Sequence, residues 1–385
     1  MTNLVISDGL PAPINGSVDL LIVAGEHSGD EHAANMLRAL LRKNPGLKVC
    51  ALGGPRLAGA GAQLLVDLTA NSTMGFAVLS KISYYRALIA KVVRWVGTHR
   101  PKAVCFVDSS GLNLRIAKGL FEQGFSAKAG GKTKALYYIS PQIWASRAGR
   151  RFEMAKHLDG LAAIFPFEPA VYADTTLPVE FVGHPFVAPD YVAPVKFDAN
   201  GPVLLLPGSR RQVVAKIFPV LLKAFEQSRT TRNAVVLYPS DEILATLQSA
   251  NPPKNISLRR TGEAGVPVAA SAVLTASGTM SMHCALAGIP GALTYKTDAL
   301  TYLLGRLLVK VEHIGIANLL LKAPMYPEFI QGAATATALA AQLRECLDSP
   351  QRLAQTKAYA TQLHALLRAP SQSTAADWVG GHLGL

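Results

Sequence analysis

The sequence predicts an α/β protein built from two facing doubly wound, Rossmann-like parallel-sheet domains with an interdomain cleft. Three observations point to this class. The chain has 385 residues, enough for about two domains. Short runs that are apolar on both faces recur along it and lead into turns and helix-like stretches, as in parallel sheets covered by helices. A proline-rich segment with few strong helix formers, Val182–Pro202, separates two such series.

The first element is the apolar run Val18–Ala24, which we expect to be a strand followed by a helix over His32–Lys43. The other strand candidates have the same character: Val49–Leu52, Ala103–Val107, Ala135–Ile139, Gly160–Ile164, Val203–Leu206, Ala234–Leu237, Ala272–Thr275 and Gly291–Tyr295. The proline-rich segment predicts a boundary between a first domain over 18–188, preceded by an extension over 1–17, and a second domain over 189–370, which is followed by the segment 371–385. Ligands bind beyond the carboxyl ends of strands in such sheets, so the cleft is the expected site.

The composition excludes a disordered chain, because half of the residues are hydrophobic and only 16% are charged. Lysine and arginine outnumber aspartate and glutamate by 38 to 25, a formal charge of +13. This balance favours an anionic partner, which is a nucleic acid, a nucleotide-sugar or an acidic membrane. Charge alone does not choose among the three.

The cysteines predict buried, reduced thiols rather than a metal site. Cys50, Cys105, Cys284 and Cys346 lie far apart, without a CxxC pair, and no HExxH motif is present. The first 17 residues lack the basic start and apolar core of a signal peptide. No apolar run reaches the roughly 20 residues that span a bilayer. We therefore expect a cytoplasmic protein, soluble or peripheral on a membrane, with no metal ion.

The first motif that can carry chemistry is Gly-Glu-His-Ser-Gly-Asp at residues 25–30, directly after the first strand. Its glycines permit tight backbone geometry, and the helix that follows can bind an anion or a polar sugar group at its N-terminus. The alternative is a plain strand-to-helix turn capped by Ser28 or Asp30. The motif is not the GxGxxG dinucleotide fingerprint. The residues alone leave both interpretations open.

Two further motifs end strands of the second domain. Leu205–Arg211 carries adjacent guanidinium groups on a small turn, and these can grip phosphate oxygens. Ala276–Ser281 precedes a helix expected over Met282–Ala287, whose free N–H groups suit a diphosphate. Each alone is equally consistent with an exposed basic turn or a helix cap. Their joint occurrence at strand ends of one domain favours a shared binding site.

Asp108 ends the apolar strand Ala103–Val107. A carboxylate in this position can accept a proton from a sugar hydroxyl as a general base. It can equally cap the turn Ser109–Gly111. From the residues alone both roles remain open.

The segment Met74–Gly97 is the strongest membrane candidate. Its apolar positions follow helical spacing, and Arg86, Lys91 and Arg94 lie on the other side. Such a helix can lie in a bilayer interface, and Leu300–Val311 has a similar pattern. The predicted membrane contacts are Met74, Tyr85, Leu88 and Trp95. The alternative is a pair of core-facing helices.

Several segments together resemble the lipid-A-disaccharide synthases, which form glycosyltransferase family 19. The matching segments, collinear over about residues 20–370, are Ala24–Asp30, Gly53–Arg56, Met74–Gly75, Asp108 with Asn113–Leu114, Ser140–Ala145 with Arg147 and Arg150, Pro166–Glu168, Phe181–Pro185, Leu206–Arg210, Ser277–Thr279, Tyr295–Lys296, Asn318–Leu319 and Pro327–Gln331. This many matches in order make the resemblance highly specific.

The resemblance implies a GT-B architecture, in which the first domain receives an acylated acceptor and the second holds a UDP-sugar. A C-terminal helix, here within Thr374–Leu385, returns toward the first domain. The implied reaction joins UDP-2,3-diacylglucosamine to 2,3-diacylglucosamine 1-phosphate. It yields the β-1,6-linked disaccharide 1-phosphate, a lipid A precursor for the Gram-negative outer membrane, and UDP. The anomeric configuration inverts, and neither a metal nor a cofactor takes part.

The resemblance also implies roles for individual residues. Asp108 would be the base, and Arg210 with the turn Ser277–Thr279 would stabilise charge on the departing UDP. The expected substrate-binding residues are Glu26, Ser28, Gly29, Asp30, Gln142, Trp144, Gly208, Ser209, Ser277, Gly278, Thr279, His283, Lys296, Asn318, Glu328 and Gln331. The implied location is the inner face of the cytoplasmic membrane, with no nucleic-acid partner. The oligomeric state stays open.

The chain also departs from the family pattern. His283 stands where the family has an acidic residue, Val213 where it has a glutamate, and Gly111 where it has a second aspartate. The stretch Glu31–Ala34 lacks the family's usual glycine. These changes keep two alternatives: a diverged GT-B transferase or epimerase that uses another UDP-sugar, and a non-catalytic relative that binds lipid or nucleotide.

Overall fold

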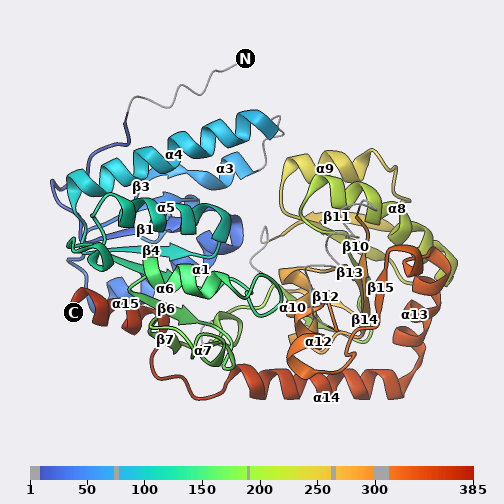
Figure 1. Cartoon of the computed structure of the whole chain (residues 1–385). Helices are drawn as coiled ribbons and strands as arrows, with labels where there is room; N and C mark the ends of the chain where they lie inside the picture. The colour runs from blue at the N-terminus through green and yellow to red at the C-terminus, as the bar shows by residue number, and fades with distance from the viewer. Residues whose placement is uncertain (1–8, 73–77, 189–190, 262–265, 298–311) are drawn as a thin grey trace. The chain divides into compact units, whose positions relative to one another are not determined.

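The computed structural model describes residues 9–72, 78–188, 191–261, 266–297 and 312–385 (Figure 1). The chain forms two compact units. Unit 1 comprises Met1–Pro185 and Ala369–Leu385, and unit 2 comprises Phe186–Arg368. Each unit contains a parallel sheet with helices on both faces, so the predicted α/β class is confirmed. The sequence placed the boundaries at 188/189 and 370/371, within three residues of these.

Unit 1 contains a seven-stranded parallel sheet in the order β3-β2-β1-β4-β5-β6-β7. Its strands are β1 (Leu20–Ala24), β2 (Val49–Gly53), β3 (Gln63–Asp67), β4 (Ala103–Val107), β5 (Lys134–Tyr138), β6 (Gly160–Ala163) and β7 (Val179–Phe181). The two central strands, β1 and β4, are buried at every position because helices cover both faces of the sheet. Chain order changes direction between them, and at such a switch point loops diverge and leave room for a ligand.

The helices of unit 1 are α1 (His27–Lys43), α2 (Pro55–Gly59), α3 (Leu68–Ser72), α4 (Val78–His99), α5 (Ser110–Glu122), α6 (Arg150–His157), α7 (Glu168–Val171) and α15 (Ala375–Leu383), with 3-10 turns at Ala127–Ala129 and Pro185–Val187. α4, α5 and α6 cover one face, and their apolar side chains form one core with alternate residues of the strands. α1 and α15 pack together on the opposite face.

The C-terminal helix α15 belongs to unit 1, although α14 before it belongs to unit 2. Its dark red ribbon lies among the blue and green elements in Figure 1. Lys134 donates from Nζ to the carbonyl oxygen of His382 at 2.7 Å, and Lys43 of α1 pairs with Asp377. These contacts fix the end of the chain against α1 and β5.

Unit 2 contains a six-stranded parallel sheet in the order β11-β10-β9-β13-β14-β15 and a separate pair, β8-β12. The strands are β8 (Val195–Phe197), β9 (Val203–Leu206), β10 (Ala234–Tyr238), β11 (Ile256–Arg260), β12 (Val268–Ala270), β13 (Ala272–Ala276), β14 (Gly291–Tyr295) and β15 (Glu328–Ile330). The helices are α8 (Arg211–Ser228), α9 (Asp241–Gln248), α10 (Thr279–Leu286), α12 (Ile316–Leu321), α13 (Ala336–Asp348) and α14 (Pro350–Leu367), with a 3-10 turn at Gln331–Ala333. α8, α9 and α13 cover one face, and α10, α12 and α14 pack together on the other.

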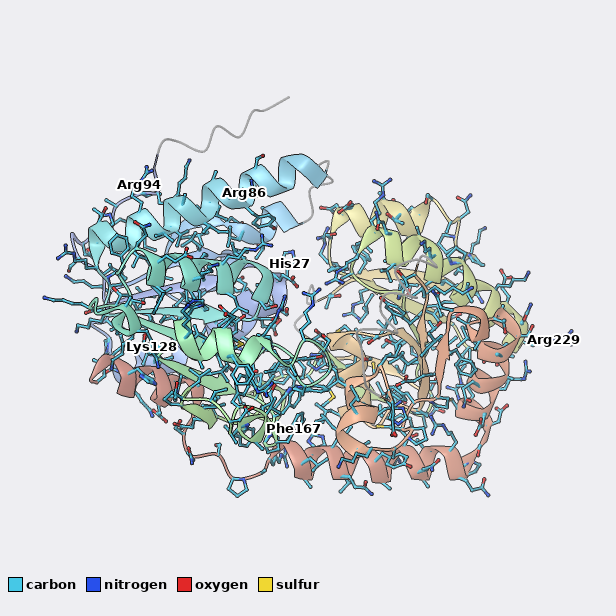
Figure 2. All side chains as sticks on the ribbon, in the orientation of Figure 1. His27, Arg86, Arg94, Lys128, Phe167 and Arg229 are labelled. Carbon is cyan, nitrogen blue, oxygen red and sulfur yellow. The ribbon has the colours of Figure 1, made fainter. Side chains whose placement is uncertain are left out.

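Helix α4 corrects the membrane prediction. Leu88 is 0% exposed and Trp95 is 4% exposed, because this apolar face packs into the core of unit 1. The indole nitrogen of Trp95 also donates to the carbonyl oxygen of Pro11 at 2.8 Å. The expected membrane contacts of Leu88 and Trp95 are therefore wrong, and the alternative of a core-facing helix is right for this face. Arg86 and Arg94 lie on its exposed side (Figure 2).

The structure says less about the other predicted membrane contacts, Tyr85 and Met74, and about the segment 300–311. Tyr85 is 36% exposed, so it remains at the surface. Met74 and the segment 300–311 lie outside the described residues. None of the helices that the structure describes is long and apolar enough to cross a membrane. All four cysteines are buried and free, as predicted.

Candidate active site

The site in unit 1 forms where the neighbouring strands β1 and β4 end. These strands pair in parallel with Ala24 beside Val107, so the loops that follow them emerge together. A Cβ atom placed on Gly25 would lie 2.9 Å from Oγ of Ser109, and one on Gly29 would lie 3.4 Å from the carbonyl oxygen of Val107. A side chain at either position would crowd the end of β4. The glycines of the first motif thus let α1 approach Asp108.

The backbone of Asp108 is held in an uncommon conformation. Asp108 has φ 51° and Ser109 has φ 44°, so two consecutive non-glycine residues occupy the left-handed region. The carbonyl oxygen of Asp108 accepts from Oη of Tyr137 at 2.5 Å and from Nδ2 of Asn113 at 2.8 Å. Asn113 is 0% exposed, and its Nδ2 also donates to the carbonyl oxygen of Val107 at 3.1 Å. These donors hold the turn that aims the carboxylate.

The surroundings of Asp108 strengthen it as a base. Burial raises the pKa of its carboxyl group, and the nearby carboxylate of Glu26 raises it further, while the backbone N–H of Ser109 offsets part of the rise. A carboxylate with a raised pKa binds a proton more readily, as a general base must. Two carboxylates in one site at a strand end are also typical of catalytic sites.

Replacing Glu26 with glutamine is expected to shift the pH dependence of activity to lower pH. Glu26 raises the pKa of Asp108, so removing its charge lowers that pKa, and Asp108 then loses its proton at lower pH. The measurement is the midpoint of the acid limb of kcat/KM against pH. Glu31→Gln is the matched control, because Glu31 lies in the same helix but pairs with Arg56 at 2.6 Å. An unmoved midpoint in Glu26→Gln would remove Glu26 from the electrostatics of Asp108.

The remaining residues of the first motif divide between structure and surface. Asp30 is 1% exposed, and its carboxylate accepts from the backbone N–H groups of Gly54, Arg56 and Leu57 at 2.8, 3.0 and 3.2 Å. It anchors the start of α2, and substrate contact by Asp30 stays a prediction. Gly29 is buried and serves the close approach described above, whereas Glu26 is exposed and Ser28 half-buried. Direct substrate contact by Ser28 and Gly29 stays a prediction.

The loop after β5 is tied to α7 through a buried carboxylate. The indole nitrogen of Trp144 donates to Oε1 of Glu168 at 3.3 Å. The other oxygen, Oε2, accepts from the backbone N–H groups of Ile164 and Phe165 at 3.1 and 3.0 Å. Gln142 in the same loop is exposed and Trp144 is half-buried, so both are open to a ligand. Glu168 belongs to the segments that resemble the family, but the sequence does not predict that it binds Trp144 and the backbone of Ile164 and Phe165.

Replacing Glu168 with glutamine is expected to flatten the pH dependence of the stability of unit 1. Burial raises the pKa of Glu168 from 4.5 to about 7, against the opposing effect of its hydrogen bonds. The folded state therefore holds the proton more tightly than the unfolded chain, and the free energy of unfolding falls as pH rises between these values, by up to about 3 kcal/mol. Denaturant unfolding at both ends of this window measures the slope.

The control for this prediction is Glu31→Gln, which changes a carboxylate on α1 that pairs with Arg56 and takes no part in the contacts of Glu168. It should leave the pH slope as it is in the unmodified protein. The emission of Trp144 should also change in Glu168→Gln, because a glutamine cannot satisfy the indole N–H and both backbone N–H groups as the carboxylate does. An unchanged pH slope in Glu168→Gln would contradict the account.

The second site forms in unit 2, where the neighbouring strands β9 and β13 end. Gly208 has φ 112°, and a Cβ there would lie 3.7 Å from Cβ of Ala276, so the two motif loops are adjacent. Ser209 and Arg210 are exposed beyond β9, and Gly278 and Thr279 are exposed at the start of α10. An exposed guanidinium beside an open helix start suits an anion. Ser277 instead donates from Oγ to the carbonyl oxygen of Ile314 at 3.1 Å.

Asn318 and Glu328 hold the loop before α12. Asn318 is 1% exposed; its Nδ2 donates to the carbonyl oxygen of Tyr326 at 2.7 Å and its Oδ1 accepts from the N–H of Tyr326 at 2.9 Å. Direct substrate contact by Asn318 stays a prediction. The carboxylate of Glu328 accepts from the N–H groups of Ile314 and Gly315, both at 2.9 Å, and from Asn318. Its first role is to fix this loop.

Gln331 contacts the segment that follows β14, in which Lys296 also lies. The amide group of Gln331 bonds to both the N–H and the carbonyl oxygen of Thr297, at 3.0 and 3.1 Å. Lys296 directly follows β14 and is half-buried. Substrate contact by Gln331, Glu328 and Lys296 stays a prediction.

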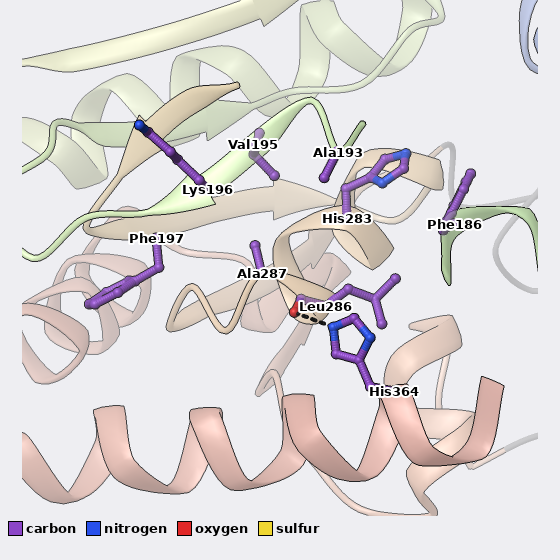
Figure 3. Close-up of a pocket in the computed structure, with 9 residues that line it drawn as sticks. All are labelled: Phe186, Ala193, Val195, Lys196, Phe197, His283, Leu286, Ala287 and His364. Atoms are coloured by element: carbon purple, nitrogen blue, oxygen red, sulfur yellow. Dashed lines mark hydrogen bonds between the residues drawn. The ribbon is translucent and has the colours of Figure 1, made fainter. Parts of the chain in front are cut away.

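His283 lines a small, mostly apolar cavity of about 210 Å³ in unit 2 (Figure 3). It is 4% exposed, its ring centroid lies 4.0 Å from that of Phe186, and its Nε2 lies 3.2 Å from Oη of Tyr191. His364 lines the same cavity and lies within hydrogen-bond distance, 3.1 Å, of the carbonyl oxygen of Leu286. The rings of Phe186 and Tyr191 thus pack against His283. Its expected substrate contact stays a prediction.

The two units together have the GT-B fold, the class in which ligands bind at strand ends like those described above. UDP-GlcNAc 2-epimerase from Neisseria meningitidis, solved with UDP-GlcNAc bound, has a TM-score of 0.60 at 12% identity, covering 91% of this chain and all of that one. CalG4, the calicheamicin glycosyltransferase, has a TM-score of 0.57 at 13% identity, covering 95% and 98%. At these identities the likeness shows the fold alone. The predicted cleft between the units stays a prediction.

The family follows from the sequence comparisons. A family model described as lipid-A-disaccharide synthetase matches residues 20–379. Lipid-A-disaccharide synthase from Geobacter metallireducens is 34% identical over 360 residues, covering 88% of this chain and 90% of that protein. Lipid-A-disaccharide synthase 1 from Legionella pneumophila is 33% identical over 377 residues, covering 92% and 94%. The chain belongs to the lipid-A-disaccharide synthase family and is a UDP-sugar-dependent glycosyltransferase.

Proposed function

We propose that this enzyme condenses UDP-2,3-diacylglucosamine with 2,3-diacylglucosamine 1-phosphate. The products are the β-1,6-linked disaccharide 1-phosphate and UDP, and the reaction inverts the anomeric carbon without a metal ion. The observation that carries the proposal is Asp108 at the end of β4: its backbone carbonyl oxygen accepts hydrogen bonds from Tyr137 and Asn113, and its carboxyl group has a raised pKa. Family membership supplies the substrate class.

The mechanism assigns the acceptor to unit 1. Asp108 takes the proton from the 6-hydroxyl of the acceptor while that oxygen attacks the anomeric carbon of the donor. The new glycosidic bond forms as the bond between the anomeric carbon and the UDP oxygen breaks. A single displacement of this kind inverts the carbon, and it needs one base and no covalent intermediate.

The donor is assigned to unit 2. The guanidinium of Arg210 and the backbone N–H groups at the exposed start of α10 stabilise the negative charge that grows on the departing UDP. The described residues contain no cluster of acidic, histidine or cysteine side chains of the kind that holds a metal ion. Arg210 and the helix start are the groups that we assign to neutralise the diphosphate.

The experiment is UDP release from the purified enzyme with both acylated sugars in detergent. We expect UDP only when donor and acceptor are both present. No release from the true pair, under conditions in which a family enzyme such as that of Geobacter metallireducens works, would rule the proposal out. UDP-N-acetylglucosamine without acyl chains, and an assay for 2-epimerisation, test the alternative of a transferase or epimerase that uses another UDP-sugar.

Because both substrates carry acyl chains, we place the enzyme on the inner face of the cytoplasmic membrane. Its formal charge of +13 favours anionic lipid. It is therefore expected to bind vesicles that contain phosphatidylglycerol at low salt and to leave them as salt rises. Sedimentation with such vesicles measures this, and a protein that stays in the supernatant at low salt contradicts the placement.

A further inference from the structure

Three arginines lie just before or at the start of α6, and the guanidinium of Arg151 already has a partner. Arg151 donates from Nε and Nη2 to the carboxylate of Asp174 at 2.6 and 2.5 Å, and its guanidinium lies 4.3 Å from the ring centroid of Phe152. The guanidinium groups of Arg147 and Arg150 differ from that of Arg151 in their contacts. Within the part of the chain that the structure describes, the guanidinium of neither residue has a hydrogen-bond or ion-pair partner. Two cations are thus available for a ligand.

The turn that carries these two arginines is fixed at both ends. Arg147 has φ 58°, in the left-handed region that a long side chain rarely occupies. The N–H of Arg150 donates to the carbonyl oxygen of Arg147 at 2.9 Å, which closes the turn and keeps the two residues close. On the N-terminal side, the bond from Trp144 to the buried Glu168 holds the loop. Strain kept in a fixed loop is typical of binding sites.

The same turn lies beside the proposed base. The positive charge of Arg150 lowers the pKa of Tyr137, which burial otherwise raises, so the guanidinium is near that ring. Tyr137 in turn donates from Oη to the carbonyl oxygen of Asp108. The pKa of Asp108 is nevertheless raised, so neither guanidinium neutralises the base. The turn follows β5 and Asp108 follows β4, and these strands pair with Tyr138 beside Val107, so both segments leave the same edge of the sheet.

This spacing fits an acceptor sugar that carries a phosphate monoester. Its reacting 6-hydroxyl and its phosphate flank the ring oxygen of a single hexose. A guanidinium binds phosphate oxygens through two parallel hydrogen bonds, and two guanidinium groups suit a dianion. The donor brings no such group, because its phosphates lie between sugar and nucleoside.

We propose that Arg147 and Arg150 form the subsite for the phosphate monoester of the acceptor, next to Asp108. The proposal rests on the proposed function, since it takes a phosphorylated sugar as the acceptor. The two arginines select an acceptor with a phosphate and orient its hydroxyl toward the base. Arg151 has no part in this subsite, because its guanidinium is bound to Asp174.

The test compares two acceptors, 2,3-diacylglucosamine 1-phosphate and the same sugar without phosphate, in detergent. For the unmodified enzyme, kcat/KM should be about 10- to 100-fold higher with the phosphate, as expected for charge-assisted hydrogen bonds. Arg150→Gln and Arg147→Asn should lose most of this preference through a higher acceptor KM, while their rates with the unphosphorylated sugar and their donor KM stay unchanged. Asparagine is chosen at 147 because it tolerates the left-handed backbone. Arg151→Gln should keep the preference.

Equilibrium binding of the two acceptor forms, measured by calorimetry, separates this proposal from the assignment of the reaction. If the unmodified enzyme binds the phosphorylated form more tightly and both variants lose that difference, the subsite is supported whether or not UDP is released. The proposal is overturned if the variants lose affinity equally for both acceptor forms, or if they keep the preference for the phosphorylated form. Vesicles with phosphatidylglycerol form the last arm: variants that lose vesicle binding but keep the acceptor preference would show that these arginines serve lipid headgroups, which also overturns it.

Discussion

Replacing Asp108 with asparagine is expected to abolish turnover and to leave UDP binding unchanged. Asparagine keeps the size of the side chain, and the hydrogen bonds from Tyr137 and Asn113 reach the backbone carbonyl, so the turn should persist. What is lost is the ability to accept the proton of the acceptor hydroxyl. General bases contribute about 100- to 10,000-fold to a rate. UDP release under saturating substrates measures the loss, and calorimetric titration with UDP checks the donor site.

The matched control is Asp174→Asn, which removes a carboxylate that pairs with Arg151 at the surface of the same unit. It should retain normal activity. If Asp108→Asn is also near normal, Asp108 has no place in the mechanism, and the carboxylate of Glu26 becomes the next candidate because it lies close enough to raise the pKa of Asp108.

Replacing Asn113 with leucine is expected to lower both kcat and stability. Leucine has the same branching and number of side-chain heavy atoms, although its methyl groups are bulkier, and it cannot donate, so the carbonyl oxygens of Val107 and Asp108 lose a buried partner. The cost of such a loss is about 1–3 kcal/mol of unfolding free energy. The left-handed turn at Asp108 and Ser109 also loses support, so the carboxylate is less well aimed. We expect kcat to fall at least about 10-fold with little change in donor KM, since misplaced catalytic groups cost rate.

Tyr137→Phe provides a milder version, because it removes one hydrogen bond and keeps the buried ring. Its neighbour gives the matched control: Tyr138 is also buried on β5 but lies on the opposite face, so Tyr138→Phe should leave kcat unchanged. Normal kcat in both Asn113→Leu and Tyr137→Phe, with only stability reduced, would show that these residues support the fold and do not position the base.

The sheet interiors could be predicted from sequence, and the sheet edges could not. The central strands are continuous apolar runs, so β4, β9 and β14 have the predicted bounds. The predictions omitted β3, β7, β11 and β15, which are the outermost strands of the two sheets, and the separate pair β8-β12. β3 is only half-buried at four of its five positions, and β15 at all three. Such strands lack the two-sided apolar pattern because one of their sides is open.

The start of α1 also could not be predicted from the sequence. The sequence placed the helix start at His32, whereas it begins at His27. Ser28, Gly29 and Asp30 lie in its first turn, because Gly29 allows the helix to meet the end of β4 at close range. A glycine pair in sequence is typical of a loop, and only the neighbouring strand reveals the close approach.

The candidate residues were found by motif, but their roles depend on partners that are distant in sequence. Asp30 binds backbone groups at least 24 residues away, and Asn318 binds the backbone of Tyr326, 8 residues away. The motifs gave no sign of these structural roles. Tyr137 went unnoticed because a buried tyrosine on a strand is ordinary core, and only the pairing of β4 with β5 brings it to Asp108. Likewise the periodicity of α4 predicts an apolar face but not whether lipid or protein covers it.

The measurement that tests the central claim most directly is the configuration of the new glycosidic bond. If Asp108 drives a single displacement on the UDP-sugar, the α-linked donor must give a β-linked disaccharide with one UDP released for each product. The proton NMR coupling constant of the new anomeric proton reports this in the product of the unmodified enzyme. A large coupling, typical of the β-linkage, is the predicted result. A small coupling, showing an α-linked product, would contradict a mechanism built on one general base.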